Sequence, residues 1–83
     1  MLIKDVMYTI MRLRMERGVK VPELARAAEI EKSAIYRMEK DPVKYGNISL
    51  NTLEKLCAAL HVSLIFLAGK AGQWHDLAEK HYR

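Results

Sequence analysis

Hydrophobic residues recur at helical spacing from the start of the chain. Val6, Ile10 and Leu13 stand at i, i+4 and i+7, and Gly18 follows them. This spacing predicts an amphipathic helix over about residues 3–17 that ends at the glycine.

Two shorter runs of the same kind lie within residues 21–39. Their apolar positions are Leu24, Ala25 and Ala28 in the first run and Ile35 and Met38 in the second. Only about three residues remain for a turn around Ile30, which is the spacing of a helix-turn-helix. Ala25 is small enough to let the second helix pack closely against the first.

The second of these helices would have a polar and basic outer face. Its residues are Lys32, Ser33, Tyr36, Arg37 and Lys40. Such a face suits the major groove of DNA, but a solvated outer face is also common on helices. The two interpretations remain open at this point.

A loop and a fourth helix are predicted next. Pro42, Gly46 and Asn47 favour an exposed loop over residues 42–48, and Ser49 is a good N-cap for the helix that follows. The buried face of that helix would consist of Leu53, Leu56, Cys57 and Leu60.

The end of the chain allows more than one interpretation. Ser63 can cap a short fifth helix, whereas residues 64–67 (LIFL) equally favour a strand. Gly69 and Gly72 then interrupt the pattern, so residues 70–83 form either a tail or a short extra helix.

The composition fits one small domain. The chain has 83 residues, of which 51% are hydrophobic, and a formal net charge of +4, which is compatible with nucleic acid. We expect the domain to span residues 1–69, with its helix-turn-helix at residues 21–39 and the tail at residues 70–83.

The single cysteine, Cys57, excludes an internal disulfide and fits the cytoplasm. No signal-peptide pattern is visible, and no apolar run reaches the ~20 residues of a membrane span.

We find no set of residues suited to catalysis or to a cofactor. The sequence shows no nucleophile with its base, no paired carboxylates and no glycine-rich phosphate loop. Cys57 and His61 are spaced i, i+4, but two ligands do not make a metal site. We therefore expect neither an enzyme nor a bound metal or cofactor.

Four segments taken in order resemble a known family. They are LRMERG at Leu13–Gly18, ELA at Glu23–Ala25, the series Ile30, Ile35, Met38 and Glu39, and SLNTLEKLCAALHVSLIFL at Ser49–Leu67. At these spacings, from about Ile10 to Leu67, the chain resembles the Cro/phage-repressor (XRE-like) helix-turn-helix family. The resemblance implies an all-α, five-helix, lambda-repressor-like domain with a short C-terminal extension. It also implies a sequence-specific double-stranded DNA-binding regulator, most simply a homodimeric repressor.

The resemblance also assigns site residues by position. It implies base contacts by Lys32, Ser33 and Arg37, and Tyr36 shares their face. Phosphate contacts are expected from cationic or hydrogen-bonding side chains near the helix ends and the loop: Lys20, Arg26, Lys40, Lys44, Tyr45 and Asn47. It further implies a structural ion pair between Arg14 and Glu39.

Three positions depart from the family pattern. Val21 replaces the usual glutamine at the start of the first short helix, and Glu29 replaces the usual turn glycine. Glu31 stands where a Ser, Thr or Asn cap is common, and its carboxylate would repel a nearby phosphate. These departures affect DNA affinity and site preference rather than the fold.

A subunit interface is expected away from the second short helix. Its candidates are Leu64, Ile65, Phe66 and Trp74, because the four residues of LIFL cannot all face a small core. Met7, Met11 and Met15 form another apolar stripe, which is either core or interface.

The alternative to a DNA-binding repressor is an antitoxin-type module that neutralises a partner toxin and regulates its own operon.

Overall fold

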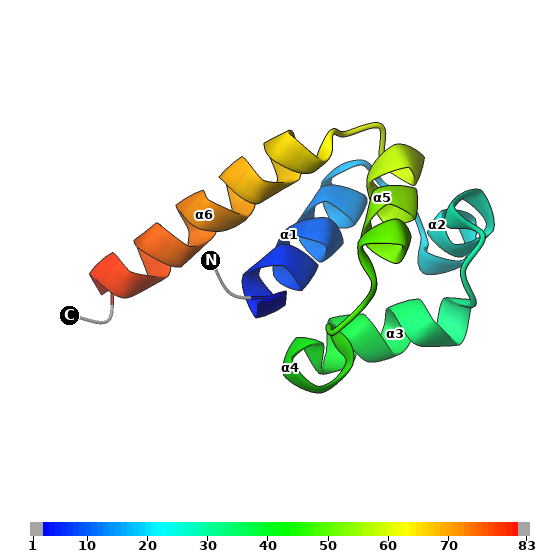
Figure 1. Cartoon of the computed structure of the whole chain (residues 1–83), viewed down its shortest axis with the longest axis horizontal. Helices are drawn as coiled ribbons and strands as arrows, with labels where there is room; N and C mark the ends of the chain where they lie inside the picture. The colour runs from blue at the N-terminus through cyan, green and yellow to red at the C-terminus, as the bar shows by residue number, and fades with distance from the viewer. Residues whose placement is uncertain (1–2, 82–83) are drawn as a thin grey trace.

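The computed structural model describes the backbone of residues 3–81 and the side chains of residues 5–72. Within this range the chain is helical, with no strand. The elements are α1 (Ile3–Glu16), α2 (Val21–Ala28), α3 (Lys32–Lys40), α4 (Pro42–Tyr45), α5 (Leu50–Ala59) and α6 (Leu64–His81) (Figure 1). The predicted all-α class is confirmed, and the alternative of a strand at residues 64–67 is wrong.

A short helix replaces part of the predicted loop at residues 42–48. The side chain of Asp41 accepts a hydrogen bond from the Lys44 N–H at 3.2 Å and so caps α4. Pro42 occupies the first turn, where its missing N–H costs little. A Cβ at Gly46 would clash with the carbonyl oxygen of Pro42, so glycine allows the tight exit from this turn.

The last helix is longer than the sequence pattern predicts. Ser63 caps α6 as expected, because its Oγ accepts the Phe66 N–H at 3.0 Å. The predicted breaks at Gly69 and Gly72 are wrong, since the helix continues through both glycines. Each glycine costs about 1 kcal/mol of helix propensity. Burial of Leu67 and Ala71, both 0% exposed, offsets this cost where α6 packs against α1.

The hydrophobic core lies between α1, α2, α3, α5 and α6. The predicted core residues are buried except Ile30 and Leu53, which are half-buried and pack against it. Met7 is buried as well, whereas Met15 is exposed, so the methionine stripe does not form one surface. Val6, from the apolar stripe of the first helix, is also in the core, and so are three residues that we did not place there: Val21, Leu67 and Ala71.

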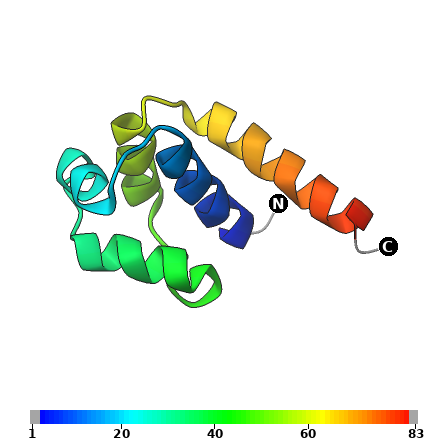
Figure 2. The ribbon, with the colours of Figure 1, turned by 180° about the vertical axis from the view of Figure 1, so that it is seen from behind.

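The helices place α3 and α6 on opposite sides of the molecule. In both views α1 runs alongside α6, and α3 lies on the far side of α1 (Figures 1 and 2). A surface on α3 and a surface on α6 can therefore contact different partners at the same time.

The described part of the chain contains no single helix that is long and apolar enough to cross a membrane. By length and composition alone, the pair Leu50–Ala59 and Leu64–Gly72 passes the same test, with a bend of 95° between the helices.

Candidate nucleic-acid interface

A tight turn sets α3 against α2. Glu29 adopts the left-handed conformation (φ 56°, ψ 45°), which glycine adopts more easily. The N–H of Ile30 then donates to the carbonyl oxygen of Ala25 at 3.0 Å. Ala25 itself is 5% exposed, as the close crossing of the two helices requires. The glutamate therefore accommodates the helix-turn-helix geometry despite its departure from the usual glycine.

The two faces of α3 differ in burial. Ile35 and Met38 lie in the core, on the face turned toward the rest of the domain. The opposite face carries exposed side chains, namely Lys32, Tyr36, Arg37 and Lys40. Ser33 is half-buried beside them. The structure thus gathers the predicted base-contact residues on one strip of one helix, which we call the α3 strip.

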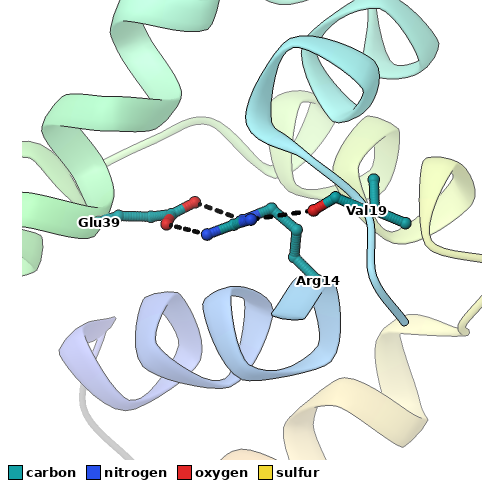
Figure 3. Close-up of polar contacts among 3 residues, drawn as sticks. All are labelled: Arg14, Val19 and Glu39. Atoms are coloured by element: carbon teal, nitrogen blue, oxygen red, sulfur yellow. Dashed lines mark hydrogen bonds and ion pairs between the residues drawn. The ribbon is translucent and has the colours of Figure 1, made fainter. Parts of the chain in front are cut away.

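An ion pair ties α1 to the end of α3. Nε and Nη2 of Arg14 donate to the two carboxylate oxygens of Glu39 at 2.9 and 2.7 Å, and Nη1 donates to the carbonyl oxygen of Val19 at 2.9 Å (Figure 3). The two charged side chains are only 15% and 17% exposed. Because this geometry is bidentate and shielded from water, it holds α3 in one orientation relative to α1.

Comparison with protein families identifies the family of the chain. The family model of the Cro/C1-type HTH DNA-binding domain matches residues 9–65, more than half of the chain. The chain belongs to this Cro/C1-type family. No curated protein and no solved structure is significantly similar to it. The matched part of the Cro/C1-type domain includes all of α2, α3, α4 and α5, so it contains the α3 strip and the turn before it.

Cationic side chains meet at the C-terminal end of the α3 strip. Here a surface cavity of about 400 Å³ is lined by Arg37, Lys40, Asp41, Lys44 and Tyr45. The Nζ of Lys44 lies 5.2 Å from the centre of the Tyr45 ring. Three of the expected phosphate-contact residues of the Cro/C1-type domain are therefore neighbours of Arg37.

The other expected phosphate contacts lie outside this cavity. Lys20 is the N-cap of α2, where no side chain caps the helix, and Arg26 is in the last turn of α2. Asn47 lies in the segment between α4 and α5. All three side chains are exposed, so each is available to a ligand on its own part of the Cro/C1-type domain.

Two residues of α5 escaped the sequence analysis. Thr52 and Lys55 line a cavity of about 360 Å³ against α3, which they share with Arg37 and Tyr45. The rest of its lining is Glu29, Ile30, Ala34, Met38 and Ile48. The sequence predicts only that Thr52 and Lys55 lie three residues apart on one helix. Nothing in it predicts that the two residues lie near α3.

The expected subunit interface of the Cro/C1-type domain is exposed in part. Ile65 is 86% exposed and Phe66 is 44% exposed, whereas Leu64 is half-buried. The Nζ of Lys70 lies 5.8 Å from the centre of the Phe66 ring. The side chain of Trp74 lies outside the described residues.

Proposed function

We propose that this Cro/C1-type domain is a sequence-specific transcriptional regulator that binds double-stranded DNA with α3 in the major groove. The observation that carries this proposal is the exposed α3 strip on a helix-turn-helix that is tied to α1 by Arg14 and Glu39. An exposed polar strip on a helix held in one orientation is what recognition of base edges requires.

The side chains of the α3 strip suit distinct base edges. Lys32 and Arg37 can donate to O6 and N7 of guanine, and the hydroxyl of Ser33 can donate or accept. Tyr36, which is 52% exposed, can contact a thymine methyl group. These four residues are our candidates for base contacts.

Phosphate contacts would flank the base contacts. Lys40, Lys44 and Tyr45 adjoin the C-terminal end of the α3 strip and offer charge and a hydroxyl to one strand. Lys20, Arg26 and Asn47 would add contacts around it. Such contacts position the domain on the duplex but carry no sequence information.

Homodimerisation would give the domain a long enough binding site. Two copies related by a two-fold axis place their recognition helices about 34–36 Å apart, one turn of DNA, on a palindromic operator. The exposed apolar side chains of Ile65 and Phe66 on α6, away from α3, are our candidates for the dimer contact. As a homodimeric repressor, the protein would block transcription by occupying that operator.

The proposal is tested by selecting bound sequences from a pool of random double-stranded DNA. We expect enrichment of a palindrome with half-sites one helical turn apart, and salt-dependent binding to it. A pool that stays random after repeated selection would refute sequence-specific binding.

The dimer is tested separately by sedimentation. We expect wild-type protein to sediment as a dimer at tens of micromolar, and Phe66→Glu to sediment as a monomer. A monomeric wild type, or a dimeric variant, would contradict this placement of the interface.

A further inference from the structure

The residue directly before α3 has an unused carboxylate. Glu31 is the N-cap of α3, with extended backbone (φ −66°, ψ 135°), yet its side chain makes no capping hydrogen bond. N-cap side chains normally accept from the free N–H groups of the first turn. Among the described residues, no hydrogen bond or ion pair engages this exposed carboxylate. A free acceptor therefore stands directly before Lys32 on the α3 strip.

Charge is distributed unevenly along the α3 strip. Glu29 and Glu31 are exposed at its start beside one cation, Lys32. Arg37, Lys40 and Lys44 are exposed at its other end beside one anion, Asp41, so the net charge is negative at the start and positive at the other end. A phosphate would be repelled at the start and attracted at the other end. The DNA backbone therefore belongs at the C-terminal end, and the start of α3 belongs where base edges rather than phosphates surround it.

The chemistry of the base edges then restricts what can face Glu31. A carboxylate only accepts hydrogen bonds. In the major groove, N7 and O6 of guanine and O4 of thymine are acceptors, so they would repel it. The amino group of adenine lies between two acceptors, its own N7 and O4 of the paired thymine, whereas the N4 amino group of cytosine has one neighbouring acceptor, O6 of the paired guanine. Cytosine is therefore the base whose major-groove edge suits the carboxylate best.

We propose that Glu31 is a specificity-determining residue that selects a cytosine in the operator by accepting from its N4 amino group. The inference rests on the proposed function and adds to it one base at one position. Lys32 is the next residue and donates where Glu31 accepts. The two side chains together suit a cytosine next to a guanine, and they reject sites that lack it.

The test compares wild type with Glu31→Gln and with the matched control Glu29→Gln. Each variant removes one exposed negative charge near the start of α3, two residues apart, and neither removes a hydrogen bond or ion pair of the folded chain. Each protein is used to select from random double-stranded DNA, and the enriched sites are then titrated with single-base changes.

We expect wild type to require cytosine at one operator position, with a loss of about 5- to 100-fold in affinity for any other base there. Glutamine pairs well with adenine, so Glu31→Gln should accept adenine at that position. Glu29→Gln should keep the cytosine preference. Both variants should bind random DNA more tightly than wild type, because each removes one repulsive charge.

Two results would overturn the inference, and they are distinguishable. If wild type enriches a defined site but Glu31→Gln selects the same bases at every position, Glu31 does not select cytosine and the proposed function stands. If wild type enriches no site, the proposed function fails and this inference fails with it.

Discussion

Replacing Glu39 by alanine should be one of the most damaging single changes outside the hydrophobic core. The change removes both acceptors of a bidentate pair and leaves the guanidinium of Arg14 with one hydrogen bond, to the carbonyl oxygen of Val19. Because Arg14 is only 15% exposed, water replaces the lost partner poorly.

The magnitude follows from this burial. Losing one partner of a fully buried pair costs about 3–5 kcal/mol, and exposed pairs contribute about 0.2–1 kcal/mol. Side chains at 15% and 17% exposure lie nearer the buried limit, so we expect Glu39→Ala to lower the free energy of unfolding by about 2–3 kcal/mol. The melting temperature of a domain this small should then fall by about 10–20 °C.

The assay is urea unfolding followed by far-ultraviolet circular dichroism, with a matched control elsewhere on α1. Glu16 forms an i, i+4 pair with Arg12 at 3.6 Å, and the two side chains are 57% and 40% exposed. Glu16→Ala should cost no more than about 0.5 kcal/mol. Arg14→Ala and the double variant with Glu39→Ala complete a thermodynamic cycle, whose coupling energy should exceed about 1 kcal/mol.

Equal losses for Glu39→Ala and Glu16→Ala would refute this reasoning. So would a coupling energy near zero between Arg14 and Glu39, because the pair would then not hold α1 and α3 together.

Three further experiments test other parts of the structure. Gly69→Ala should raise the free energy of unfolding by about 0.5–1 kcal/mol in the same urea assay, because the glycine is inside α6 and nothing lies within 4 Å of an added Cβ. Burial, and then the charge of Glu54, raise the pKa of the Cys57 thiol. Alkylation by iodoacetamide should therefore need a higher pH than for a cysteine peptide, and a rate profile equal to that of the peptide would show Cys57 to be accessible. Folding favours the neutral form of this thiol. The resulting stability is fully present below the pKa that Cys57 has in the unfolded chain, and it is lost as the pH rises through the pKa that Cys57 has in the folded protein. Lys44→Ala should weaken binding to all DNA sequences alike and reduce the slope of log affinity against log salt by about one, whereas an unchanged slope would remove Lys44 from the phosphate contacts.

Helix starts and stops with a local chemical signal could be predicted from the sequence. Ser49 caps α5 by accepting from the Thr52 N–H at 3.1 Å, and Gly18 takes a positive φ of 66° after α1. The length of α6 could not be predicted in this way, because it depends on burial of Leu67 and Ala71 against a distant helix. Local propensity at the two glycines favours a break, and tertiary packing overrides it.

The same distinction holds for the candidate site. The α3 strip follows from helical periodicity, since residues on one face of a helix are set by their spacing. The partner of Arg14 is 25 positions away, so only the resemblance to a family pointed to Glu39. Thr52 and Lys55 line the cavity beside α3 because α5 packs near α3 in the fold. Local sequence patterns do not predict such an arrangement of two helices.

The central claim is that the α3 strip recognises base edges, and Arg37 tests it most directly. The measurement is the ratio of affinities for the selected operator and for a scrambled duplex, in wild type, Arg37→Ala and the control Arg17→Ala, which removes an exposed arginine just after α1. We predict that Arg37→Ala lowers this ratio by about 5- to 100-fold, whereas Arg17→Ala leaves it unchanged. Equal losses on both duplexes for Arg37→Ala would contradict the claim and would assign Arg37 to the phosphate contacts.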